Sequence, residues 1–127
     1  MPDPAPNVAV VGASTDTTKH SAQSVRAHAG CGFNVYPINP KASHVEGLPA
    51  YASVSVAPVD RFDRITMYVP PTVGIALLDE IAAKGCDELW LNPGSESDAL
   101  VEQARQLGLN PIVACSLIDC ANRRPAG

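Results

Sequence analysis

Long hydrophobic runs are absent from this chain of 127 residues, and so is the pattern of a secretory signal. No segment approaches the roughly 18 consecutive apolar residues that a membrane-spanning helix requires. The first residues also lack a positively charged stretch followed by an apolar one, which marks a secretory leader. We therefore expect a cytoplasmic protein with no membrane partner.

Charged and aromatic residues are scarce as well, at 17% and 5% of the chain. The formal net charge is −4, and negative charge is repelled by a phosphate backbone, so nucleic acid is not an expected partner. An anionic ligand has to be held by local groups rather than by the overall field. Hydrophobic residues nevertheless make up 46%, which suits one folded domain of this length.

The four cysteines, Cys31, Cys86, Cys115 and Cys120, have no C-x-x-C spacing. Without that spacing and without a secretory signal, the sequence predicts free thiols rather than a disulfide framework. The same spacing argument gives no reason to expect a metal site.

The most informative segment that is present runs from Val8 to Ser14 and reads Val-Ala-Val-Val-Gly-Ala-Ser. An apolar run that stops at a glycine predicts a buried parallel strand followed by a sharp turn. A helix is expected over 21–29. Free N–H groups in a strand–turn–helix unit, together with the positive end of the helix dipole, form a site for anions such as phosphate.

Strand and helix patterns then alternate along the chain, which predicts βαβ units and a parallel sheet. Strands are expected over 8–11, 33–38, 64–69, 88–91 and 111–114, with 51–56 as an edge strand or a brief helix. After the first helix, helices are expected over 72–84, capped by Thr72, and over 96–107, opened by a Ser95–Asp98 capping box. The predicted fold class is α/β: a single Rossmann-like, doubly wound, mostly parallel sheet with helices on both faces.

This domain is expected to span residues 8–120, between a flexible arm over 1–7 and a frayed tail over 121–127. In such sheets, ligands bind beyond the carboxyl ends of the strands, where the strand order reverses. The residues that follow the predicted strands are therefore the candidate site: 12–14, 39–41, 70–71, 92–94 and 115–116.

The first turn lacks the sequence patterns of two common nucleotide-binding sites, and this limits the classes of ligand that we expect. Only Gly12 of the dinucleotide pattern G-x-G-x-x-G is present, and the second strand ends in Asn39-Pro40 rather than in an acidic residue that binds a ribose diol. The Walker pattern G-x-x-x-x-G-K-[ST] is missing too. Lys19 and Ser21 add a cation and a hydroxyl to the loop, which favours a phosphate-bearing ligand.

Three segments together resemble the CoA-binding domain family, which includes small stand-alone Rossmann proteins and the N-terminal domain of the succinyl-CoA synthetase α subunit. These segments are Val-Val-Gly-Ala-Ser over 10–14, Lys-His-Ser over 19–21 and Val-Tyr-Pro-Ile-Asn-Pro-Lys over 35–41. The similarity extends over about residues 7–116. It implies that the ligand is coenzyme A (CoA) or an acyl-CoA.

The resemblance carries over to particular positions as CoA contacts. They are Gly12, Ala13, Ser14, Lys19, Ser21, Asn39, Pro40, Lys41, Pro70, Pro71, Pro93 and Gly94. The first three would face the diphosphate, and Lys19 and Ser21 would add phosphate contacts. The segment 39–41 would border the adenosine, with Lys41 on a ribose phosphate.

The remaining positions of that set have more general roles. Pro70 and Pro71 would shape the wall near the adenine or pantetheine, and Pro93-Gly94 would lie on the pantetheine path. Asp16 departs from the family pattern because it brings a negative charge to the phosphate loop. Cys115 would either be a buried, inert thiol or meet the CoA thiol in a mixed disulfide.

The sequence supports no catalysis of its own, because no nucleophile, base and acid stand at a telling spacing. His28 and His44 are predicted to lie at the surface. The first interpretation is thus a non-catalytic CoA-binding or regulatory module, either a homodimer or a partner of an acyl-CoA enzyme. The alternatives are an NAD(P)-binding oxidoreductase, a CoA-ligase-related enzyme subunit, and an interaction domain whose pocket has decayed.

Overall fold

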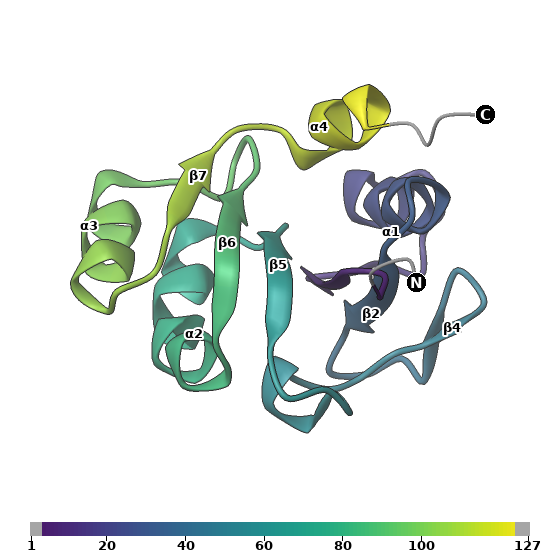
Figure 1. Cartoon of the computed structure of the whole chain (residues 1–127), viewed down its shortest axis with the longest axis horizontal. Helices are drawn as coiled ribbons and strands as arrows, with labels where there is room; N and C mark the ends of the chain where they lie inside the picture. Colours follow the sequence, from purple (N-terminus) through teal and green to yellow (C-terminus); the bar gives the residue numbers. More distant parts are fainter. Residues whose placement is uncertain (1–3, 124–127) are drawn as a thin grey trace.

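A computed structural model describes residues 4–123 and shows one central sheet of parallel strands (Figure 1). The sheet has five strands in the order β2-β1-β5-β6-β7. Their bounds are β1 (Asn7–Val11), β2 (Asn34–Ile38), β5 (Phe62–Met67), β6 (Cys86–Leu91) and β7 (Pro111–Val113). Each neighbouring pair is parallel, as the alternation of strand and helix patterns predicts.

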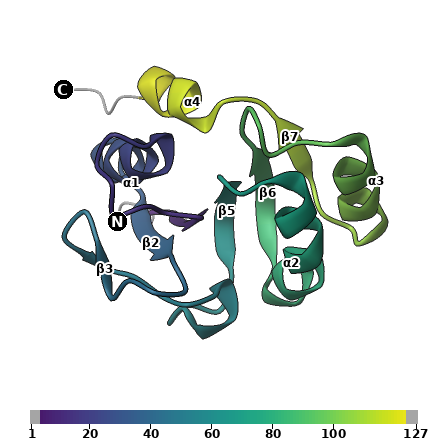
Figure 2. The ribbon, with the colours of Figure 1, turned by 180° about the vertical axis from the view of Figure 1, so that it is seen from behind.

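Helices cover both faces of this sheet (Figures 1 and 2). Helix α1 (His20–Gly30) packs against α4 (Ser116–Asn122) on one face, and α2 (Pro71–Lys84) packs against α3 (Asp98–Gln106) on the other. The predicted fold class, a doubly wound α/β sheet with helices on both faces, is confirmed.

The strand order reverses between β1 and β5, because the chain leaves β1 for β2 on one side and later returns to β5 on the other. Residues 51–56 combine both predicted alternatives. Tyr51 forms a single parallel bridge with Ile38, and a 3₁₀ helix, η1 (Val54–Val56), follows it. A small antiparallel hairpin of β3 (His44–Val45) and β4 (Leu48–Pro49) precedes them.

The core lies on both sides of β1, because successive side chains of a strand point to opposite faces. Ala9 joins the cluster under α2 and α3, which includes Leu78 and Leu100. Val10 joins the cluster under α1, which includes Val25. The continuous apolar run of the first strand is therefore buried on both faces, as predicted.

In two helices, α2 and α3, the N-cap residue differs from the one that the sequence patterns predict. Ser97, not Ser95, caps α3 and accepts a hydrogen bond from Leu100 N at 3.1 Å. Ser95 is held in the preceding turn, where its N–H donates to Asn92 O at 2.8 Å. Helix α2 begins one residue before Thr72, after a Pro70 N-cap, because proline at the first helical position needs no acceptor.

The first and last elements of the described chain extend into the segments predicted as an arm and a tail. Asn7 already belongs to β1, and residues 121 and 122 complete α4, a helix that the sequence analysis did not predict. Buried Cys120 and Ser116 anchor this short helix to α1 and the sheet. Of the predicted arm and tail, residues 1–3 and 124–127 lie outside the described part.

His28 is wholly buried, so its predicted surface position is wrong. Its Nδ1 donates to Ser24 O at 2.8 Å, and its Nε2 faces Arg64 Nη1 at 3.3 Å. Because a guanidinium only donates hydrogen bonds, Nε2 must accept this one and the ring is neutral. Arg64 itself is 1% exposed and is paired with Glu88 and Asp119. Burial, reinforced by the Arg64 charge, lowers the pKa of His28 from 6.5 to about 4.

Candidate functional site

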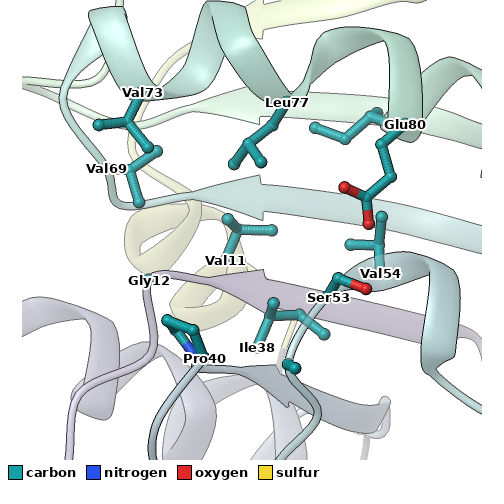
Figure 3. Close-up of a pocket in the computed structure, with 12 residues that line it drawn as sticks. Val11, Gly12, Ile38, Pro40, Ser53, Val54, Val69, Val73, Leu77 and Glu80 are labelled. Atoms are coloured by element: carbon teal, nitrogen blue, oxygen red, sulfur yellow. The ribbon is translucent and has the colours of Figure 1, made fainter.

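An apolar cavity of about 270 Å³ lies at the carboxyl edge of the sheet, beside the point where the strand order reverses (Figure 3). Its lining comes from the ends of β1 and β2, from η1, from the segment after β5 and from α2. The lining residues are Val11, Gly12, Ile38, Pro40, Ala52, Ser53, Val54, Val69, Val73, Leu77, Glu80 and Ile81. A cavity of this size with an almost wholly apolar lining suits an aromatic ring system.

Glu80 is the one ionisable side chain in that lining, and its carboxylate lies beside Ser53 and Val54 in Figure 3. Its Oε1 accepts hydrogen bonds from Ser55 N at 3.2 Å and from Ser55 Oγ at 2.9 Å. The carboxylate is thereby fixed on the η1 side of the cavity. Its second oxygen can accept a hydrogen bond from a ligand's amino group.

A second cavity, of about 320 Å³, lies on the other side of the first turn. It is more polar than the first and is lined by Lys19, His20, Ser21, Tyr68, Val69, Pro70, Pro93, Gly94 and Ser95. Val69 lines both cavities, so they adjoin along the edge of the sheet. The start of α1 lies between the turn and this second cavity.

The amides of the first turn are not free, contrary to the expectation from the sequence. Gly12 N and Ala13 N both donate to Ile38 O, at 3.2 and 3.1 Å, and Ser14 N donates to Ser21 Oγ at 3.1 Å. Ile38 ends the neighbouring parallel strand, so its carbonyl lies directly beside the turn. These amides therefore hold the turn against β2.

Free donors are found instead at the start of α1. The N–H groups of His20, Ser21 and Ala22 have no acceptor within residues 4–123, and the N-cap residue Lys19 provides no capping side chain. The positive end of the helix dipole and the Lys19 ammonium add to these donors. The N–H groups free to bind an anion therefore belong to residues 20–22 rather than to residues 12–14.

Gly12 is required by close packing as well as by its backbone angle. Its φ is +85°, and a Cβ there would lie 2.9 Å from Val69 Cγ1 and 3.0 Å from Tyr68 O. The first turn thus approaches Tyr68 and Val69, in the segment after β5, more closely than any other residue type permits without strain. This contact keeps the two cavities next to each other.

Asn39 connects the loop after β2 to the first turn. Its side-chain amide donates to Ala13 O at 2.9 Å, and its Oδ1 accepts from Lys41 N at 2.8 Å and from Ala42 N at 2.9 Å. Asn39 therefore shapes the rim of the first cavity, and Lys41 is left exposed on that rim.

The carboxylate of Asp16, the negatively charged group of the loop, is hydrogen-bonded within the loop. Its Oδ1 accepts hydrogen bonds from Thr18 N at 3.0 Å and from Thr18 Oγ1 at 2.7 Å. These hydrogen bonds keep the pKa of Asp16 below its usual value. The charge stabilises the turn that leads into Lys19.

A buried polar network lies beneath the second cavity; the sequence analysis placed Asn92 and Ser116 at this edge of the sheet but did not predict the hydrogen bonds that join them. Asn92 Nδ2 donates to Thr66 Oγ1 at 2.7 Å, while Asn92 Oδ1 accepts from Ser116 N at 2.8 Å. Ser116 Oγ is 3.1 Å from Tyr68 Oη, and burial raises the pKa of Tyr68. This network fixes the end of β6 and the start of α4, so the second cavity has a rigid base.

The predicted site residues fall into three groups. Gly12 and Pro40 line the first cavity; Lys19, Ser21, Pro70, Pro93 and Gly94 line the second; and Ala13, Ser14, Asn39, Lys41 and Pro71 line neither. The sequence did not indicate the η1 and α2 side chains, because they do not stand directly after a strand of the central sheet. Cys115 is partly buried at the start of α4.

Within residues 4–123, no three His, Cys, Asp or Glu side chains gather in a group that could hold a metal ion. Nor does any helix in that range combine the length and apolar character needed to cross a bilayer.

A model of the CoA binding domain matches residues 6–121 of this sequence. The chain belongs to the CoA binding domain family. The resemblance inferred from the first turn and the segments 19–21 and 35–41 is therefore confirmed. Among curated proteins, no match was found.

Solved structures with the same fold include two archaeal proteins. A conserved hypothetical protein from Pyrococcus furiosus has a TM-score of 0.79 and 30% identity, over 90% of this chain and 98% of that one. A hypothetical protein from Pyrococcus horikoshii OT3 has a TM-score of 0.85 and 22% identity, over 94% of this chain and 84% of that one.

A much longer protein also contains this fold. An acetyl-coenzyme A synthetase from Ca. Korarchaeum cryptofilum, in complex with phosphate and ADP, has a TM-score of 0.73 and 30% identity. The match covers 85% of this CoA binding domain chain but only 25% of the synthetase. The chain is thus similar to one domain of that enzyme.

Proposed function

We propose that this chain binds CoA or an acyl-CoA along the carboxyl edge of its sheet, with the first cavity as the adenine site. The observation that carries this proposal is the apolar cavity between Gly12, Pro40 and α2, at the reversal of strand order in a CoA binding domain. Glu80 is available to accept a hydrogen bond from the adenine amino group. Lys41, on the rim, is available for the ribose phosphate.

The diphosphate then lies at the start of α1. The unpaired N–H groups of residues 20–22 and the exposed Lys19 ammonium supply donors and positive charge there. From that point the pantetheine extends into the second cavity, past Pro70 and Gly94. The shared wall at Val69 supports one continuous ligand across both cavities.

We further propose that the chain acts as a binding or regulatory module rather than as a catalyst. In the described residues, the ionisable groups of the second cavity are Lys19, His20 and Tyr68. Among the described residues, the Lys19 and His20 side chains make no hydrogen bond to a serine or cysteine, and the serine hydroxyls that Tyr68 contacts, those of Ser116 and Ser24, are buried. A cytoplasmic location and a homodimer stay predictions of the sequence.

A second candidate function is that of a CoA-binding subunit in a larger acyl-CoA enzyme. The similarity to about a quarter of an acetyl-coenzyme A synthetase favours it. In that case catalysis requires a partner chain, and the isolated chain binds CoA without turning it over.

Thermal unfolding with CoA, acetyl-CoA, dephospho-CoA, NAD and NADP tests the ligand class directly. A ligand at 100 times its Kd stabilises the folded state by about 2.7 kcal/mol, which is a clear shift in Tm. We expect CoA and acetyl-CoA to raise the Tm and NAD to leave it unchanged. A shift with NAD or NADP alone would indicate an oxidoreductase, and no shift with any ligand would indicate a decayed pocket.

The variant Lys19→Ala locates the diphosphate. We expect a several-fold loss of CoA affinity with little change in Tm without ligand, because Lys19 is exposed. Arg105→Ala, which removes an exposed cation of α3, is the matched control. Equal CoA affinity in both variants and the wild type would exclude Lys19 from the site.

A further inference from the structure

A separate cavity, of about 320 Å³, lies between α1 and α4, on the face of the sheet that these helices cover. Small residues and two thiols form most of its lining, which consists of Ala27, Gly30, Cys31, Leu117, Cys120 and Ala121. Because glycine and alanine have little side-chain bulk, the two helices meet here with little between the thiols. None of these residues lines the two cavities of the proposed CoA site.

The two thiols differ in their surroundings. Cys31 follows the last residue of α1 and is partly exposed, and its Sγ lies 3.6 Å from His28 O. Cys120 lies within α4 and is only 3% exposed. Burial, and then the hydrogen bond with the Cys31 thiol, raise the pKa of Cys120 to about 12. The two thiols thus line the same small cavity where α1 packs on α4, although 88 residues separate them in the sequence.

We propose that Cys31 and Cys120 form a reversible intramolecular disulfide that joins the end of α1 to α4. The partly exposed Cys31 is the thiol that meets the oxidant, and the buried Cys120 is the resolving thiol. In the described chain, the other two cysteines lie elsewhere, Cys86 at the start of β6 and Cys115 before α4. All four cysteines are free thiols in this structure, so the bond forms only on oxidation.

The oxidant is a low-molecular-weight disulfide, RSSR. The Cys31 thiolate attacks one of its sulfur atoms, forms a mixed disulfide and releases the first RS⁻. The Cys120 sulfur, after giving its proton to solvent, attacks the Cys31 sulfur and displaces the second RS⁻. In total the protein loses two protons and two electrons, and RSSR leaves as two RSH.

Treatment of the whole chain with oxidised glutathione, followed by intact mass measurement and peptide mapping without reduction, tests this proposal. We expect a loss of roughly 2 Da, corresponding to two hydrogens, and one linked peptide pair that contains Cys31 and Cys120. Dithiothreitol should reverse the change. A stable glutathione adduct on Cys31 without a cross-link, or a cross-link to Cys86 or Cys115, would overturn the proposal.

Two variants provide the controls. Cys86→Ser, which removes another partly buried thiol, should form the same cross-link as the wild type. Cys31→Ser should form none, and it avoids changing the buried Cys120. Oxidation should also raise the Tm of the wild type and of Cys86→Ser, but not that of Cys31→Ser, because only a cross-link restricts the unfolded chain. A Tm unchanged by oxidation in a cross-linked sample would show that α1 and α4 had separated to form the bond.

Discussion

The side-chain amide of Asn39 donates a hydrogen bond of 2.9 Å to the main-chain carbonyl of Ala13. This bond joins the loop after β2 to the turn after β1, and Gly12 N and Ala13 N reinforce the connection through Ile38 O. The two loops that border the first cavity therefore behave as one rigid unit. Changes in either loop are expected to affect both the stability of the fold and the shape of the proposed adenine site.

Asn39→Ala leaves the Ala13 carbonyl and the N–H groups of Lys41 and Ala42 without their side-chain partner. We expect a loss of roughly 1–3 kcal/mol in the free energy of unfolding, together with weaker CoA binding. Urea unfolding and calorimetric titration measure the two effects. Asn110→Ala is the matched control, because Asn110 Nδ2 makes only a long, exposed contact of 3.4 Å with Asp87 O. Equal stability of the two variants would contradict the prediction.

Lys41→Ala tests the proposed contact with the ribose phosphate. Because Lys41 is exposed, its charge is screened, and we expect a loss of about 1 kcal/mol in CoA binding, or roughly fivefold in Kd. Dephospho-CoA, which lacks that phosphate, should bind the variant and the wild type equally well. If both ligands lose affinity to the same extent, Lys41 acts elsewhere on the ligand.

Gly12→Ala places a methyl group against Val69 Cγ1 and Tyr68 O, at a φ of +85°. We expect a loss of roughly 1–3 kcal/mol in unfolding free energy and a loss of CoA binding, since Val69 separates the two cavities. Gly30→Ala is the control: no atom lies within 4 Å of its added methyl group. That variant should retain CoA affinity and be as stable as the wild type or more so. Wild-type stability in Gly12→Ala would mean that the turn relaxes easily.

His28 makes the stability of the fold dependent on pH. Its folded-state pKa of about 4 is lower than the ordinary value of 6.5, so the unfolded chain takes up the proton first as the pH falls. The stabilisation is present above pH 6.5 and is lost as the pH falls toward 4. At about 1.4 kcal/mol for each pKa unit, the loss is roughly 3 kcal/mol.

Chemical unfolding at several pH values between 7 and 4 measures this loss. His28→Gln should flatten the dependence in that range, whereas His44→Gln, at an exposed position, should keep it. A wild-type curve that stays flat from pH 6.5 to 4.5 would contradict the burial of a neutral His28.

Much of the fold follows from local patterns. The apolar run over 8–11 and the turn at Gly12 predict the first strand and the start of α1, and the residues that follow each strand were predicted to meet at one edge. Gly12, Pro40, Pro70 and Gly94 do line the two adjoining cavities there. The reason is geometric, since parallel strands bring all their carboxyl ends to the same side.

Other features depend on contacts between distant segments. The burial of His28 requires Arg64 from β5. The polar base of the second cavity requires Asn92 from β6 and Ser116 from α4. No local pattern reveals such pairs, because each residue by itself is equally suited to a surface position.

The sequence by itself determined the βαβ alternation, the parallel sheet and the edge at which the candidate site lies, because these depend on the periodicity of apolar residues and on glycine at the first turn. Only the tertiary structure decided which donors are free there. Ile38 O accepts hydrogen bonds from the N–H groups of Gly12 and Ala13, although Ile38 belongs to a strand that follows α1 in the chain. The N–H groups left without an acceptor are therefore those at the start of α1. A hydrogen-bond donor is available only if folding brings no acceptor to it.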